Sequence, residues 1–290
     1  MKKIIFVFFF LLLLSCSKIN TYNKKQENIF ELNLKGRANI ISKADNVMYE
    51  GISTGIYVPF KDSSITTTKT SFSNRLYISG VSGSLLGGPV FLTVGKNYDI
   101  YGYAPYQQGA VTPESISGFK SGDDVMAANK VTILNVSETN NSALLSFEHL
   151  VSQISFDVVC EDSGVVINQT SSIEVSGFYS TAILNLTNRS LIPGGSASPI
   201  VSSGATGTLS IEPLCFFIDP VSIMELGIKV TIDGVTFNGT ISRQFVAGES
   251  YRYTVTIPAT TQELKFSATL TPWVVIDDEI VVSNSKNIIY

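Results

Sequence analysis

The sequence has 290 residues, of which 44% are hydrophobic and 15% are charged, and its formal net charge at pH 7 is -4. This composition excludes an intrinsically disordered chain, which needs low hydrophobicity, and a basic surface for nucleic acid. The length is sufficient for one or two domains, each with its own hydrophobic core.

The amino terminus predicts export. Lys2 and Lys3 precede an apolar run over residues 4–14, which is shorter than the roughly 20 residues of a membrane span. Residues 13–16, Leu-Leu-Ser-Cys, resemble a bacterial lipobox, in which the cysteine becomes the first mature residue and carries acyl chains. We expect a lipoprotein signal peptide at 1–15, lipidation of Cys16 and a polar tether at 16–28, because more than one acyl chain anchors a protein stably.

From residue 29 onward, apolar residues recur at every second position, which is the period of a strand with one buried face. Such runs cover residues 30–34, 52–60, 98–104, 131–136, 146–160, 224–232, 235–241, 251–257 and 264–270. Asp233 and Gly234 predict a tight hairpin between two of these runs. Residues 79–88 and 118–124 are rich in glycine and serine and predict loops. These features indicate an all-β chain of antiparallel sandwiches.

The run at 146–160 stands near the middle of the chain. Ile154, Phe156 and Val158 alternate with Gln153, Ser155 and Asp157, as in a strand with a defined inner face. Strand patterns on both sides of it are numerous enough for two separate sheets. We therefore predict an N-terminal domain over 29–145 and a C-terminal domain over 146–290.

Side chains for catalysis or metal binding are sparse. The single histidine, His149, has no cluster of Cys, Asp or Glu at ligand spacing, which favours a packed or capping residue over a base or ligand. Acidic residues at 123–124 and 277–279 have no partner placed across a cleft, as glycoside hydrolysis requires. We predict no catalytic residue, no metal, no cofactor and no enzymatic activity.

Two cysteines, Cys160 and Cys215, are left after Cys16 is assigned to lipid. In an oxidising compartment they could pair and stabilise the fold by several kcal/mol in the denatured-state model. The alternative is two buried thiols that pack as small hydrophobes. The sequence leaves both alternatives open because it does not give their separation.

Six segments together resemble one protein family. They lie at residues 30–38, 55–59, 98–106, 147–156, 247–253 and 271–273, the last with Trp273. In this order and spacing they are similar to the fimbrillin family, the lipoprotein pilins of Bacteroides-group bacteria, also called type V pilins. The resemblance covers about residues 30 to 273.

This resemblance implies two transthyretin-like β-sandwich domains in tandem and a structural role in adhesive surface fimbriae. Pilins of this family are cut on the cell surface by a trypsin-like protease, after an arginine that follows the first strand. Here the cut would follow Arg37 and remove the strand with Phe30, Leu32 and Leu34. The partners would be copies of this chain or other pilin subunits, with an outer membrane lipid anchor before processing and the fimbrium afterwards. The resemblance indicates no particular adhesion ligand.

A removed strand leaves unpaired backbone groups that a strand from another subunit can complete. The candidate donor is the apolar carboxyl-terminal segment, with residues Ile280, Val281, Val282, Ile288, Ile289 and Tyr290. Part of 274–282 could instead close the protein's own second sheet. The arginine assignment also has an alternative, because 35–37 could be a simple basic turn and four other arginines would be equivalent if exposed: Arg75, Arg189, Arg243 and Arg252.

A rival hypothesis is a monomeric surface lipoprotein that binds glycan or another ligand. Such a protein would display a planar aromatic platform, for which Tyr101, Tyr103 and Tyr106 are the candidates. Alternating tyrosines are also common on an ordinary sheet face.

Overall fold

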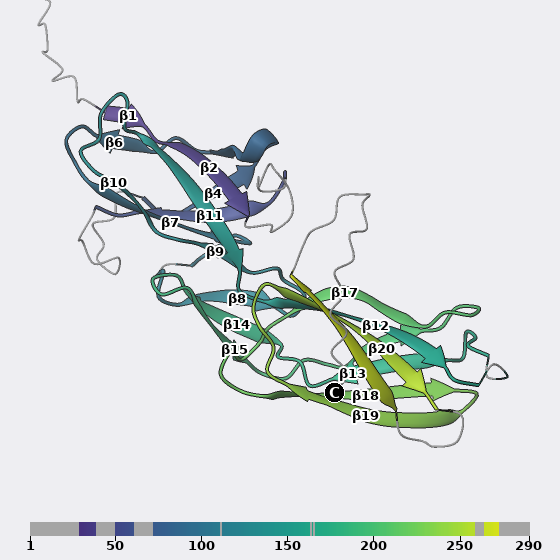
Figure 1. Cartoon of the computed structure of the whole chain (residues 1–290). Helices are drawn as coiled ribbons and strands as arrows, with labels where there is room; N and C mark the ends of the chain where they lie inside the picture. The colour runs from purple at the N-terminus through teal and green to yellow at the C-terminus, as the bar shows by residue number, and fades with distance from the viewer. Residues whose placement is uncertain are drawn as a thin grey trace, which may run out of the picture.

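The computed structural model describes residues 29–38, 50–60, 72–110, 112–162, 164, 166–258 and 264–272. Within these ranges the fold consists of β-strands and one short 3-10 helix, η1 (Val81–Gly83), so the predicted all-β class is confirmed. The strands form two lobes, one above the other in Figure 1. In this part of the chain, no helix has the length and apolar character to cross a membrane.

The first lobe is a sheet that almost closes on itself. Its strands are β2 (Asn33–Ala38), β3 (Ser53–Val58), β4 (Phe72–Ser79), β5 (Leu85–Gly87), β7 (Tyr98–Ala104), β9 (Met126–Ala128), β10 (Val131–Ile133) and β11 (Ser142–His149). They are ordered β2-β11-β9-β7-β3-β4-β5, with β10 beside β7, and a small separate sheet pairs β1 (Ile29–Glu31) with β6 (Phe91–Thr93). An isolated bridge between Lys35 of β2 and Ser84, just before β5, brings the two ends of the order together.

The second lobe is a sandwich of two four-stranded sheets. One has the order β17-β12-β20-β21 and the other β16-β13-β18-β19. Their bounds are β12 (Ser152–Cys160), β13 (Ser172–Ser176), β16 (Ile200–Ser203), β17 (Ser210–Phe216), β18 (Met224–Ile232), β19 (Val235–Arg243), β20 (Glu249–Ile257) and β21 (Lys265–Pro272). Side chains from both sheets meet in one buried cluster that includes Ile154, Phe156, Leu226 and Tyr253.

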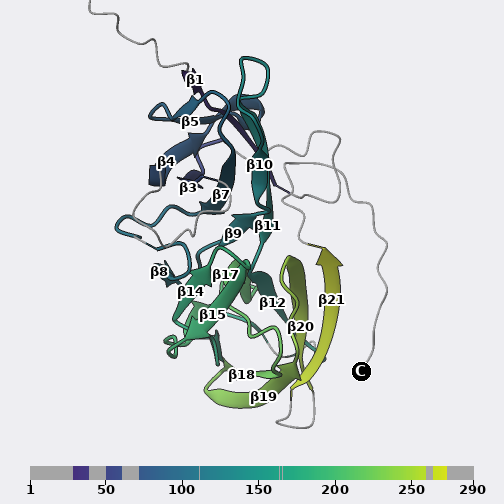
Figure 2. The ribbon, with the colours of Figure 1, turned by 90° about the vertical axis from the view of Figure 1, so that its left-hand side faces the viewer.

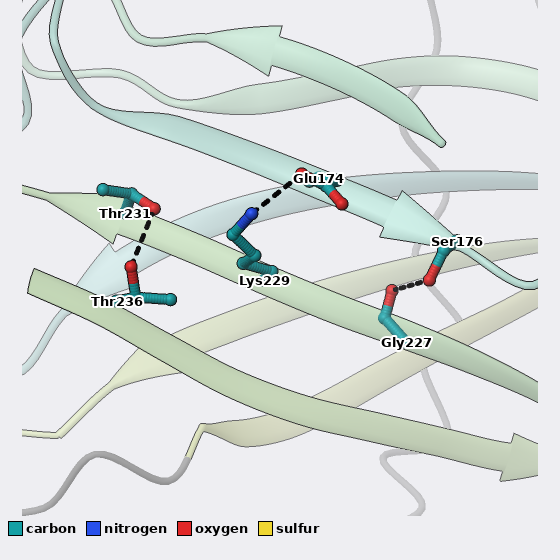
Figure 3. A network of polar contacts seen from close by, with 6 residues as sticks. All are labelled: Glu174, Ser176, Gly227, Lys229, Thr231 and Thr236. Atoms are coloured by element: carbon teal, nitrogen blue, oxygen red, sulfur yellow. Dashed lines mark hydrogen bonds and ion pairs between the residues drawn. The ribbon is translucent and has the colours of Figure 1, made fainter. Parts of the chain in front are cut away.

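The hairpin between β18 and β19 forms as the sequence predicts. Ile232 pairs with Val235, so Asp233 and Gly234 are the two turn residues, and both have positive φ, at 50° and 77°. Buried and less buried residues alternate along the whole of β18. On the outer face, cross-strand polar contacts join Lys229 to Glu174 at 3.1 Å and Thr231 to Thr236 at 3.3 Å (Figure 3).

A third group of strands joins the two halves of the sequence. It is ordered β15-β14-β8 and contains β8 (Ile116–Lys120), β14 (Thr181–Asn185) and β15 (Ser190–Gly194). A buried cluster there packs Tyr103 and Phe119 from the first half against Leu184 and Phe217 from the second. The division into domains 29–145 and 146–290 stays a prediction, and β8 pairs across it.

Two predicted loops are wrong in part. Residues 79–88 contain η1 and β5, and residues 118–124 begin inside β8. The glycine content was misleading in the second of these segments. Gly118, with φ 106°, lies in β8, and the ladder of β8 with β14 shifts register between Ala182 and Leu184. A glycine can mark such an irregularity as well as a loop.

The predicted single strand at 146–160 is also wrong, since it is two strands that belong to different sheets. Leu145 and Phe147 face the core of the first lobe, whereas Ile154 and Phe156 face that of the second. The inward-facing residues have odd numbers in β11 and even numbers in β12. The change occurs at residues 150 and 151, between the two strands. Most ladders are antiparallel as expected, but β2 with β11 and β12 with β20 are parallel.

The shared cluster predicts that Phe119 stabilises the whole molecule. Its side chain is 0% exposed, and its ring meets that of Tyr103 edge to face, with centroids 6.2 Å apart. We expect Phe119→Ala to lower the free energy of unfolding by about 3–5 kcal/mol, as is usual for a buried aromatic residue. Chemical denaturation measures this change, and Ile183→Ala, at a side chain 41% exposed on β14, is the control. Equal effects of the two substitutions would contradict the role of the shared cluster.

Candidate functional site at the amino-terminal edge strand

The first strands of the chain close the first lobe by backbone pairing. β2 runs parallel to β11, from Asn33 opposite Ser142 to Ala38 opposite Phe147. β1 runs antiparallel to β6. At the step between β1 and β2, the Leu32 N–H donates to the Val90 carbonyl at 2.8 Å. Residues 29–38 are thus held by β11 and β6 together.

The side chains of this segment alternate as the sequence predicts. Leu32 and Leu34 are 5% and 6% exposed, and Phe30 packs against the same cluster. Glu31, Asn33 and the residues at 35 and 37 are exposed. Full burial of a leucine contributes about 1.5–3 kcal/mol, so this short segment covers a sizeable part of the core.

β2 lies at the edge of its sheet, whereas its counterpart in the second lobe, β12, lies between two other strands. In the described chain β2 pairs with β11 on one side, and its other side has the single bridge from Lys35 to Ser84. β12 also starts its lobe and also has a parallel partner, but it lies between β17 and β20 and is continuous with β11 through residues 150 and 151. Release of β2 would therefore cost one ladder, whereas release of β12 would cost two.

Arg37 lies at the exposed end of β2, where its Nε donates to the Ser146 hydroxyl at 2.6 Å. Of the other candidate arginines, three lie within or at the end of a strand, and Arg189 lies in a hairpin turn. Arg252 is in β20, with partners on both sides, and bonds Asp157 at 2.7 Å. Arg189 is between the strands of the β14–β15 hairpin and bonds Glu148 at 2.6 Å. Arg75 is inside β4, and Arg243 ends β19 with its guanidinium 4.5 Å from the Tyr251 ring centroid.

The contacts of Ser146 and Ser84 with this strand were not found from the sequence. Ser146 is 109 residues from Arg37, and nothing in the local pattern of either segment indicates the contact. The signal that could have found them is the pairing of the first strand with β11, which is a tertiary property.

His149 has the packed position that its isolation in the sequence favours. It is 8% exposed, and its Nδ1 lies 2.7 Å from the Asp124 carboxylate. The contact joins the end of β11 to the chain just before β9. Within the described residues, no group of three or more His, Cys, Asp or Glu side chains could hold a metal ion.

Cys160 and Cys215 are free thiols in the structure, so the disulfide alternative is not realised there. Cys215 pairs with Gln153 near the start of β12, whereas Cys160 is the last residue of that strand. At about 3.3 Å per residue this separates them by roughly 20 Å, far beyond the reach of a disulfide.

The tyrosines proposed as a sugar platform are mostly inside the molecule. Tyr103 is 0% exposed, and burial raises its pKa to about 12. Its ring covers Gly55 so closely that a Cβ at that position would overlap it. Tyr101 is also buried, and Tyr106 is half-buried. This cluster packs the junction between the lobes and displays no planar aromatic surface.

Cys16 and the six candidate donor residues, Ile280, Val281, Val282, Ile288, Ile289 and Tyr290, lie outside the described residues, as does Trp273. The described chain ends with β21, whose Pro272 pairs with Glu249 at the start of β20. The neighbouring Gly248 N–H donates to the Val151 carbonyl at 2.9 Å, between β11 and β12. The ends of β2 and β21 therefore both lie near the junction of the lobes, as Figures 1 and 2 also show.

Taken together, these features define an all-β protein of two lobes, with an edge strand at its amino terminus that closes the first. A family model described as fimbrillin-like matches residues 37–273. The chain belongs to this family, and the resemblance found in the sequence is confirmed. No curated protein sequence matches the chain.

Several solved structures share the fold. A candidate cell adhesion protein from Bacteroides ovatus has 16% identity and a TM-score of 0.66, over 86% of this chain and 99% of that chain. One from Bacteroides uniformis has 17% identity and a TM-score of 0.61, over 84% and 98%. The tip fimbrial protein Mfa3 from Porphyromonas gingivalis, with a C-terminal truncation, has 11% identity and a TM-score of 0.51, over 84% and 100%. At these identities the likeness extends to the fold alone.

The positions of the cysteines predict their reactivity. Burial raises the pKa of Cys215 to about 12, and Cys160 is the less buried thiol. Because the thiolate is the reactive form, Cys160 should react first with a thiol reagent at pH 8 in a Cys16→Ser chain. After unfolding without reductant, both should be alkylated. The control is Cys160→Ser in the same chain, in which only the slower reaction of Cys215 should remain. If the unfolded chain is alkylated only after reductant is added, the prediction of free thiols is wrong.

Proposed function

We propose that this chain is a pilin subunit that is exported as a lipoprotein, cut after Arg37 and polymerised by strand exchange into surface fimbriae. Membership in the fimbrillin-like family supports a fimbrial role. The observation that carries the proposal is that β2 closes the first lobe through a single ladder and has an exposed arginine, Arg37, just before its last residue.

The cut would separate residues 29–37 from the rest of the lobe. Without them, β6 loses its partner, β11 loses its partner on one side, and the core around Leu145 and Phe147 loses its cover. An unmade buried hydrogen bond costs about 1–3 kcal/mol, so such a groove favours any strand that completes it. A strand from another copy or another pilin subunit would do so, with main-chain bonds for strength and alternate side chains for register.

The carboxyl-terminal segment is the proposed donor. The chain leaves β21 near the junction of the lobes, and the residues that follow include two apolar groups, 280–282 and 288–290. Before processing, the lipid on Cys16 would hold the subunit at the outer membrane, and afterwards the subunit would belong to the fimbrium. No side chain acts as a catalyst in this mechanism, because assembly uses backbone pairing.

Amino-terminal sequencing of subunits from surface fibres should give Ala38 as the first residue. Arg37→Gln should leave a folded, exported subunit that forms no fibres, because a trypsin-like protease needs the basic side chain. Arg75→Gln, in the middle of β4, is the matched control and should assemble normally. Fibres whose subunits still begin at acylated Cys16 would show that this processing is not required.

Deletion of residues 283–290 should leave a folded, secreted monomer that no longer polymerises, because it removes the last residues of the proposed donor and keeps every strand up to β21. Size-exclusion chromatography and electron microscopy measure the loss. A Lys286→Ala chain, which keeps the apolar residues at 288–290, is the control and should assemble. Normal fibres from the deleted chain would exclude this segment as the donor.

A further inference from the structure

The contacts that hold residues 29–37 do not depend on the bond that processing would cut. The β1–β6 ladder, the bond from Leu32 to Val90 and most of the β2–β11 ladder all lie on the amino-terminal side of Arg37. So do the bond from the Asn33 N–H to the Asn141 carbonyl at 2.9 Å and that from the Asn141 Nδ2 to the Glu31 carbonyl at 3.0 Å. Hydrolysis after Arg37 removes one residue, Ala38, from the end of the ladder.

The side-chain contacts also survive the cut. Leu32 and Leu34 are buried in the core of the first lobe, with Phe30 packed beside them. Arg37 itself keeps its hydrogen bond to Ser146. A segment that is buried on one face and bonded along two other strands has no reason to leave when a single peptide bond at its end is broken.

We propose that the processed subunit retains residues 29–37 as a noncovalently bound strand. The incoming strand then displaces these residues, and it does not enter a groove that is already empty. This rests on the proposed function and adds a step to its regulation. In the cut, water adds across the Arg37–Ala38 peptide bond, which leaves a carboxylate on Arg37 and an ammonium group on Ala38. The retained strand is still continuous with Cys16, so the nicked subunit stays tethered until displacement is complete.

Displacement begins at the Arg37 end of the strand. Gly36 has no side chain to bury, and Lys35 and Arg37 are exposed, so the last three residues are held by the ladder, the bridge from Lys35 to Ser84 and the Ser146 contact. Toward the amino terminus the strand is anchored by Leu34 and Leu32. An incoming strand can thus pair with β11 near the junction of the lobes first and release the leucines last.

The test uses the exported chain with Cys16→Ser, nicked by an arginine-specific protease in limited digestion. Native mass spectrometry should find the core that begins at Ala38 with its amino-terminal peptide still bound. The release rate follows from exchange with a labelled synthetic peptide of residues 29–37. Leu32→Ala in that peptide should raise its release rate roughly 30-fold or more, as expected for loss of a buried leucine. Asn33→Ala, at an exposed position of the same strand, should leave the rate unchanged.

Because the substitutions are made in the peptide, folding of the core does not affect the comparison. The proposal would be overturned if the amino-terminal peptide were released as fast as the Arg37–Ala38 bond is hydrolysed. Equal release rates for the Leu32→Ala and Asn33→Ala peptides would also overturn it. Failure of the proposed function looks different. In that case fibre subunits would begin elsewhere than Ala38, whether or not the peptide stays bound to a core nicked in vitro.

Discussion

The parallel pairing of β2 with β11 is the interaction on which the rest of the first lobe depends. A sheet with the order β2-β11-β9-β7-β3-β4-β5 has two edges, and the contact of Lys35 with Ser84 brings them together. This near-closure brings the two edges of the sheet together around the core that contains Leu32, Leu34 and Phe147. Closure is achieved by β2, which lies near the start of the described residues.

The junction between the lobes does not use that strand. The buried cluster around Tyr103, Phe119 and Phe217 contains no residue of β1 or β2. The polar contacts of the junction, Glu148 with Arg189 and His149 with Asp124, likewise come from β11 and the segments beyond it. These junction contacts are therefore independent of β1 and β2.

Side chains that carry chemistry in other proteins are structural here. His149 joins two segments, Cys160 and Cys215 are separate thiols, and Tyr103 covers Gly55 at the junction. In the proposed assembly, β11 would offer a partner its row of backbone donors and acceptors, which β2 covers in this structure. In that assembly, the spacing of inward residues such as Leu32 and Leu34 would set the specificity for a partner, because alternate side chains set the register of an added strand.

The sequence by itself determined the all-β class, the β18–β19 hairpin and the buried face of the first strand. These are local properties: alternation places Phe30, Leu32 and Leu34 on one side, and Asp233 and Gly234 both adopt positive φ. It also carried the family resemblance, through the order of short segments. It failed where glycine marks an irregular strand, as at Gly118, and where one periodic run changes its inward face, as at residues 150 and 151.

Only the tertiary structure decided which strand lies beside which. The parallel ladders, the contact of Arg37 with Ser146 and the pairing of β8 with β14 join segments that are far apart along the chain. The separation of Cys160 from Cys215 and the burial of Tyr103 follow from the same pairings. A two-residue period fixes the face of a strand but not its neighbour, because every strand offers the same backbone groups to any partner that the rest of the fold brings to its edge.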